Sequence, residues 1–170
     1  VEFRDVSFRY PDAGENELNH ISFRLERGKT LAIIGATGSG KSTLISLIPR
    51  FYDTTEGEVL VDGVNVRDYS FDALYDRLGY VTQKAVLFSG SIKENILFGE
   101  SRAEGGDENV AEAIEISQAK EFVDKLPEGT EHRIAQLGRN VSGGQKQRLS
   151  IARALARRPE ILIFDDSFSA

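Results

Sequence analysis

The stretch TLAIIGATGSGKST, residues 30–43, decides the fold that we expect for this chain. Its first part, residues 30–35, is a short apolar run ending in glycine, which is typical of a strand buried on both faces of a sheet. Its second part fills the pattern G-x-x-x-x-G-K-[ST] with Gly35, Gly40, Lys41 and Ser42. An apolar helical stretch, TLISLI, follows. This order of strand, glycine-rich loop and helix predicts a loop that binds phosphate groups.

The residue types in this loop suit a nucleoside triphosphate. Glycines let backbone N–H groups turn inward around an anion without interference from Cβ atoms. The helix that starts near Lys41 directs the positive end of its dipole at the phosphates. We expect Lys41 to reach the β- and γ-phosphates, and the Ser42 hydroxyl to suit Mg²⁺. On these residues alone, a strand-to-helix turn without a ligand remains the alternative.

Strands are expected on both sides of the first helix. Apolar and polar residues alternate over residues 1–10, with a slip at Asp5–Val6 that suits a bulge, and again over residues 20–28. Residues 57–66 offer two short strands around the turn signal Asp62–Gly63. A last buried strand is expected at residues 160–164.

Helices are expected in the middle of the chain. Ser91 and Glu94 have the spacing of a capping box, and apolar residues at helical spacing run from Val110 to Leu126. Residues 100–109 read as a polar loop, and a further helix should run from Ser142 to about Arg158. The sequence therefore predicts one α/β domain over residues 1–170, with an inserted helical lobe at about 84–153.

Composition narrows the class of protein. The chain has 170 residues, 40% of them hydrophobic, enough for one domain with a core. Its net charge of −6 is opposite in sign to that expected of a nucleic-acid-binding domain. It has no cysteine for disulfides or thiolate metal sites. It has no apolar run of membrane-spanning length and no leader pattern. Because it also lacks methionine and stops abruptly, we expect a C-terminally truncated piece of a longer polypeptide.

A second anion-binding surface is predicted at Ser142, Gly143, Gly144 and Gln145. Ser142 and Gln145 have capping-box spacing, and the two glycines expose backbone N–H groups at a helix start. An ordinary cap with a glycine turn is the alternative, and the residues alone leave both open.

Four segments in this order and spacing resemble the nucleotide-binding domain of an ATP-binding cassette (ABC) transporter of the multidrug and lipid exporter type. They are GATGSGKS, YVTQKAVLFSGSIKENILFG, VSGGQ and ILIFDD, and the likeness runs from end to end. The resemblance implies a P-loop NTPase (RecA-like) core, an N-terminal antiparallel β subdomain and an inserted α-helical lobe. It implies ATP and Mg²⁺ as cofactors, and a head-to-tail dimer in which each ATP lies between one phosphate loop and the partner's SGGQ helix. It further implies a transmembrane domain, with this domain on the cytoplasmic face of the cell membrane, and no nucleic-acid partner.

The resemblance also assigns roles to single residues. Tyr10 matches the aromatic that stacks on adenine, and Gln83 matches the glutamine that senses Mg²⁺ and the attacking water. Asp165 matches the aspartate that holds Mg²⁺ through water. The catalytic residues expected are then Asp166, Gln83 and Lys41, and the metal residues Ser42, Gln83 and Asp165. The nucleotide-binding residues expected are Tyr10, Gly35, Thr37, Gly38, Ser39, Gly40, Lys41, Ser42, Thr43, Ser142, Gly143, Gly144 and Gln145.

Asp166 departs from the family pattern, in which glutamate activates the attacking water. Aspartate lacks one methylene, so its carboxylate is drawn back by about 1.5 Å, and a misplacement of about 1 Å can cost roughly 10²-fold in rate. We therefore expect slow hydrolysis. The resemblance further implies a heterodimer whose other chain has glutamate there, because some exporters of this family pair one competent site with one degenerate site. A nucleotide-gated binding module with little hydrolysis, and a soluble ABC ATPase unconnected with transport, are the alternatives.

Residues 84–91 could form a docking surface for a membrane domain or simply pack in the core.

Overall fold

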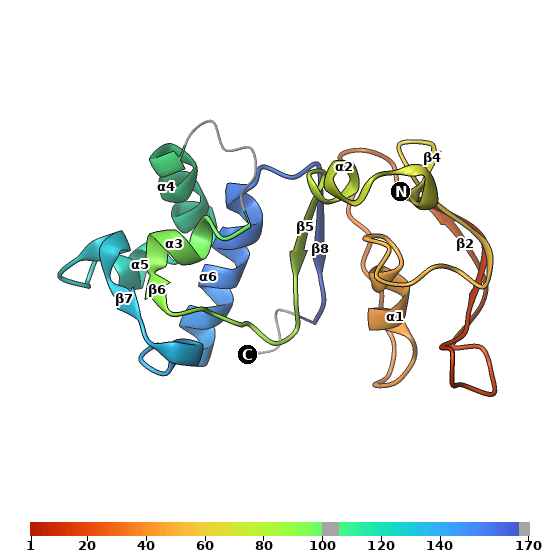
Figure 1. The fold of residues 1–170 in the computed structure, drawn as a ribbon, viewed down its shortest axis with the longest axis horizontal. Coiled ribbons are helices and arrows are strands. Elements are labelled where there is room, and N and C mark those ends of the chain that lie inside the picture. The colour runs from red at the N-terminus through yellow and green to blue at the C-terminus, as the bar shows by residue number, and fades with distance from the viewer. Residues whose placement is uncertain (100–105, 167–170) are drawn as a thin grey trace. The chain divides into compact units, whose positions relative to one another are not determined.

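The computed structural model describes residues 1–99 and 106–166, and the chain divides into two compact units, Val1–Tyr75 and Asp76–Ala170 (Figure 1). Each unit combines β-strands with helices, the mixture that the sequence predicts. Among the described residues, no helix has the length and apolar character needed to span a membrane.

The first unit is built on a four-stranded antiparallel sheet in the order β2-β1-β3-β4. Its strands are β1 (Glu2–Phe8), β2 (Leu18–Arg24), β3 (Glu56–Val61) and β4 (Val64–Asn65). The strands predicted within residues 1–10 and 57–66 are thus confirmed, whereas the one predicted at residues 20–28 begins earlier and ends earlier, at Leu18–Arg24. The unit is completed by α1 (Lys41–Ser46), a 3₁₀ turn (Val66–Asp68) and α2 (Phe71–Tyr75).

Two local predictions in this sheet are confirmed. The pairing of β1 with β2 shifts register between Phe3 and Val6, where Asp5 has a φ of 50°. The turn between β3 and β4 has two central residues, Asp62 and Gly63, with φ values of 49° and 78°. Two central residues with positive φ define the turn that best matches the twist of a hairpin.

The predicted buried strand at residues 30–35 is wrong. The structure assigns no strand there, and Ile34 is 94% exposed. A strand is held by backbone hydrogen bonds to a neighbour, and within the described first unit the four-stranded sheet does not include this segment. Apolar character alone therefore did not make this segment a strand.

The second unit holds a parallel pair, β5 (Leu78–Val81) and β8 (Ile161–Phe164), and a short antiparallel pair, β6 (Gly90–Ser91) and β7 (Arg133–Ile134). Its helices are α3 (Ile92–Ile96), α4 (Gly106–Ile116), α5 (Lys120–Val123) and α6 (Gly143–Ala156), with 3₁₀ turns at Gly129–Glu131 and Gln136–Gly138. The last predicted strand is confirmed, but not its burial on both faces. Ile163 is buried and Leu162 is 41% exposed.

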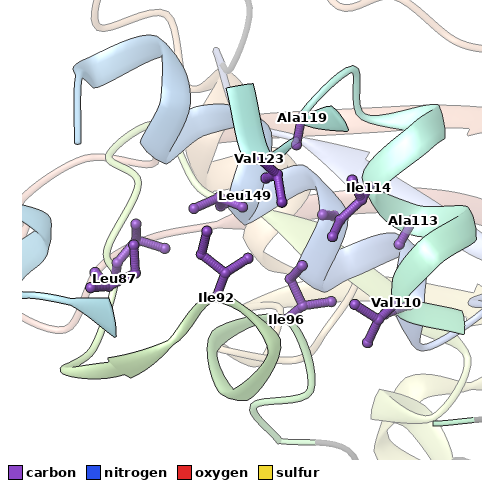
Figure 2. Close-up of a cluster of buried hydrophobic side chains, with 12 residues drawn as sticks. Leu87, Ile92, Ile96, Val110, Ala113, Ile114, Ala119, Val123 and Leu149 are labelled. Atoms are coloured by element: carbon purple, nitrogen blue, oxygen red, sulfur yellow. The ribbon is translucent and has the colours of Figure 1, made fainter. Parts of the chain in front are cut away.

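Helices α3, α4, α5 and α6 enclose the core of the second unit (Figure 2). Side chains at helical spacing on α4 and α6 meet the apolar face of α3, as a buried amphipathic stripe requires. The members of the cluster are Leu87, Ile92, Ile96, Val110, Ala113, Ile114, Ala119, Val123, Ile134, Leu149, Ala152 and Ala156.

The predicted helix caps are confirmed, and one helix boundary is not. Ser91 caps α3 and Ser142 caps α6, each in a complete capping box. The helix expected to continue to Leu126 instead ends at Ile116, because Gln118 takes a φ of 59° before α5 begins. Of the loop expected at residues 100–109, the part 106–109 belongs to α4, and residues 100–105 lie outside the described residues.

Candidate functional site

The predicted phosphate loop is a tightly curled turn in the first unit. Gly38 and Gly40 have φ values of 79° and 82°, in the left-handed region that favours glycine. A Cβ atom on Gly35 would lie 2.5 Å from the Ser39 hydroxyl oxygen, so the loop closes on itself at this point. The glycines of the pattern are therefore needed for backbone conformation and for close approach.

Lys41 folds back over this loop. Its Nζ donates to the carbonyl oxygens of Gly35 and Ala36, each at 2.8 Å. The neighbouring Ser42 is exposed, as are Thr37, Gly38 and Ser39. An ammonium bonded to neutral oxygen atoms, here two carbonyls and the Ser39 hydroxyl, can exchange these bonds for stronger ones to an anion. The lysine is thus positioned at the loop and free to turn to a phosphate group.

Tyr10 lies at the end of β1 in the same unit. Its hydroxyl is 2.9 Å from the Thr43 hydroxyl, which belongs to α1. The structure therefore brings the predicted adenine-stacking residue together with the last residue of the predicted phosphate loop.

In the second unit, three predicted residues lie together at the ends of two parallel strands. Gln83 follows β5, while Asp165 and Asp166 follow β8. The register of the pair, with Val81 opposite Phe164, places these ends side by side. Gln83 Nε2 donates to Asp166 Oδ2 at 2.9 Å. Polar residues beyond the carboxyl ends of parallel strands are the usual place for ligand binding in α/β proteins.

Tyr80 also belongs to this group, although no motif in the sequence singles it out. Its hydroxyl donates to Asp165 Oδ2 at 3.5 Å. Burial of the ring, and secondly the nearby charge of Asp165, raise the pKa of Tyr80 to about 12. From the sequence alone, an aromatic residue in a strand is expected to pack in the core rather than to bind a polar group. The parallel pairing of β5 with β8, which brings Tyr80 close to Asp165, could not be read from the sequence.

Asp166 has a φ of 45°. Aspartate is one of the few residues other than glycine that adopt this left-handed conformation readily, because its short polar side chain bonds locally. The local backbone thus gives a physical reason for aspartate at this position.

The predicted second anion-binding surface starts α6. Ser142 Oγ accepts a bond from the Gln145 backbone N–H, and Gln145 Oε1 accepts one from the Ser142 N–H. Gly143 and Gly144 are exposed, and a Cβ on either would meet nothing within 4 Å. Their N–H groups find no acceptor in residues 1–99 and 106–166. The helix start therefore presents two amides to the outside.

The segment 84–91 is partly buried and partly exposed. Leu87 is 1% exposed and belongs to the core, whereas Val86 and Phe88 are 44% and 43% exposed. Phe88 stacks on Phe98 at a centroid distance of 4.3 Å. Beneath these rings, Arg153 of α6 places its guanidinium 5.5 Å from the Phe88 centroid.

Comparisons with known proteins give the family. The model of the family described as ABC transporter matches residues 18–169. A protein of Bacillus subtilis named as a putative multidrug export ATP-binding/permease protein is 47% identical over 170 residues, which cover 100% of this chain and 29% of the relative. Multidrug resistance protein 1 of Entamoeba histolytica is 45% identical over 172 residues, covering 100% of this chain and 13% of the relative.

A solved structure agrees. The structure of a bacterial Atm1-family ABC exporter with ATP bound matches 99% of this chain and 29% of its own chain, with a TM-score of 0.91 and 37% sequence identity. The predicted P-loop NTPase fold, of mixed α/β class with an antiparallel β part and helices, is therefore confirmed. The chain spans 29% of the length of the Bacillus subtilis relative. The chain belongs to the ABC transporter family.

Proposed function

We propose that this chain binds and hydrolyses ATP to power export, and that ATP drives its head-to-tail association with a second domain of the same kind. The observation that carries this proposal is that one chain has two separate surfaces whose geometry suits an anion. One is the curled phosphate loop with Lys41, and the other is the exposed pair of amides at Gly143 and Gly144. One surface would serve the chain's own nucleotide and the other its partner's.

Mg²⁺ is the metal that we propose with ATP. Ser42, Gln83 and Asp165 all offer oxygen atoms, which are the donors that Mg²⁺ prefers. Gln83 uses its Nε2 to bond Asp166, so its carbonyl oxygen is the atom available to a cation. When bound, the ion would neutralise charge on the phosphate oxygens. Lys41 would add a second positive charge there.

Asp166 is the group that we propose to orient the attacking water and accept its proton. Its carboxylate already accepts a bond from Gln83 and sits on a side chain one methylene shorter than glutamate. Both features disfavour fast hydrolysis. They also support the second candidate, a nucleotide-gated module in which ATP closes the dimer and little is hydrolysed. In either case we propose a heterodimer in which the partner has glutamate at the matching position.

The relatives support a proposal of membrane association. The Bacillus subtilis relative is named as a combined ATP-binding and permease protein, and this chain covers 29% of it. We propose that a transmembrane domain lies on the same polypeptide. We also propose that the nucleotide-binding domain formed by residues 1–170 works at the cytoplasmic face of the cell membrane. The exposed Val86 and Phe88 support a docking role for residues 84–91. The net charge of −6 disfavours nucleic acid as a partner, because nucleic acid is itself negatively charged.

ATP turnover by the intact protein tests the proposal, measured first without a partner subunit and then with it. We expect slow turnover by the homodimer and an increase of roughly 10²-fold on Asp166→Glu. Asp124→Glu is the matched control, because it adds the same methylene to an aspartate that is exposed and pairs only with Lys120 in the described residues. Fast turnover by the unmodified homodimer, lost on Asp166→Ala, would remove the argument for an asymmetric partner.

A further inference from the structure

Three aromatic rings meet at the end of β1. The ring of Tyr10 stands nearly perpendicular to Phe8 and to Tyr52, at interplanar angles of 82° and 86° and centroid distances of 4.8 and 5.2 Å. Phe8 and Tyr52 are 5.5 Å apart. Perpendicular contacts at these distances are favourable, and together they fix the plane of the central ring.

The backbone that carries these rings is itself held in place. The Phe8 carbonyl accepts a bond from the Glu17 N–H at 2.8 Å, and the Arg9 N–H donates to the Thr55 hydroxyl at 3.0 Å. The residue after Tyr52, Asp53, accepts a bond from Arg50 Nε at 2.8 Å. Tyr10 and Tyr52 therefore project from two anchored segments.

The hydroxyl of Tyr10 adds a link to the phosphate loop. Its partner, the Thr43 hydroxyl, is 2.9 Å away on a residue only 7% exposed. Thr43 lies two residues after Lys41, in the helix that leaves the loop. The Tyr10 ring is thus held by its aromatic neighbours Phe8 and Tyr52, and its hydroxyl group is held by Thr43.

We propose that Tyr52 and the Tyr10–Thr43 hydroxyl pair are positioning groups that fix Tyr10 for contact with an aromatic nucleobase. The proposal rests on the proposed function, because it takes Tyr10 as the residue that meets the adenine of ATP. Its new content is that base and phosphates are recognised by one pre-assembled element of the first unit. Tyr52 acts through Tyr10 and needs no contact with the nucleotide.

Preorganisation sets the size of the effect. Without Tyr52, the Tyr10 ring gains rotamer freedom that nucleotide binding must then remove. Ordering one such side chain weakens binding by about two- to tenfold. This loss of affinity is expected for ligands that carry a base. It is not expected for a bare chain of phosphates.

The experiment compares dissociation constants of the intact protein for Mg-ATP and for Mg-tripolyphosphate, by calorimetry. For Tyr52→Ala we expect ATP to bind about two- to tenfold more weakly, with tripolyphosphate unchanged. Tyr52→Phe keeps the ring and should restore ATP binding. Tyr10→Phe keeps the ring but loses the Thr43 bond, and should weaken ATP without weakening tripolyphosphate.

A double-mutant cycle separates positioning from direct contact. In a Tyr10→Ala background, Tyr52→Ala should have no further effect on ATP. The proposal is overturned if Tyr52→Ala binds ATP as the parent does, if it weakens both ligands equally, or if its effect persists without Tyr10. Failure of the proposed function looks different, since the parent protein would then bind neither ligand.

Discussion

Arg153 offers the sharpest test of how the second unit is held together. From α6 its Nε donates to the Asn95 carbonyl at 2.8 Å, its Nη1 to the Val86 carbonyl at 2.9 Å, and its Nη2 to Asn95 Oδ1 at 3.2 Å. Its guanidinium also lies 5.5 and 5.8 Å from the centroids of Phe88 and Phe98. One side chain thus joins the SGGQ helix to α3 and to the segment that follows Gln83.

The cost of Arg153→Ala can be worked from these contacts. The two shorter of these three hydrogen bonds, to the Asn95 and Val86 carbonyls, contribute about 3–6 kcal/mol, at about 1.5–3 kcal/mol each for a charged donor. Burial of the guanidinium offsets part of this, and the same burial lowers the pKa of Arg153. We expect a net loss of about 2–4 kcal/mol, because two acceptors are also left without a donor. That corresponds to roughly 30- to 700-fold in an opening equilibrium.

Hydrogen exchange of the intact protein, followed by mass spectrometry, is the assay. Peptides from residues 84–99 should exchange faster by that factor, while peptides from β1 and β3 should not change. Arg148→Ala is the matched control, since this arginine of α6 bonds the Gln118 carbonyl and Glu121 at the surface and should cost at most about 1 kcal/mol. Equal exchange of residues 84–99 in both variants would refute the reasoning.

Three further substitutions test the fold. Gly57→Ala should destabilise the first unit by more than about 2 kcal/mol, because Gly57 has a φ of 71° and a Cβ would clash with the Asp5 carbonyl oxygen; unchanged exchange in β1 would contradict this. Gln118→Gly should stabilise the second unit by about 1 kcal/mol, seen as slower exchange around residue 118, and faster exchange would count against it. Tyr80 has its pKa raised to about 12, so the fold keeps its proton when the unfolded chain loses it near 10. The contribution of Tyr80 to stability should be constant below pH 10 and fall towards pH 12; Tyr80→Phe should remove that fall, and a fall that persists would exclude Tyr80 as its source.

Short-range features were predictable from the sequence. The two capping boxes, the bulge near Asp5 and the Asp62–Gly63 turn each depend on residues within a few positions of one another. The curled conformation of the predicted phosphate loop belongs to the same class, because its glycines and lysine lie within one turn of chain.

The misses have physical causes of two kinds. The helix ends at Ile116 because Gln118 occupies the left-handed position of a C-terminal cap, with bonds from Gln118 N–H to the Glu115 carbonyl and from Ala119 N–H to the Ile114 carbonyl. Glycine is the usual residue there, so glutamine gave no signal. The roles of Arg153 and Tyr80 depend on contacts with segments that are distant in the sequence. Such contacts can be recognised only in the folded structure.

Calorimetric titration of the intact protein with Mg-ATP tests the central claim most directly, with Lys41→Ala measured alongside. We expect saturable binding by the parent protein and a loss of roughly 10- to 150-fold in the variant, because a charged donor to phosphate contributes about 1.5–3 kcal/mol. Absence of binding by the parent, or equal affinity in the Lys41→Ala variant, would contradict a nucleotide site built on this loop.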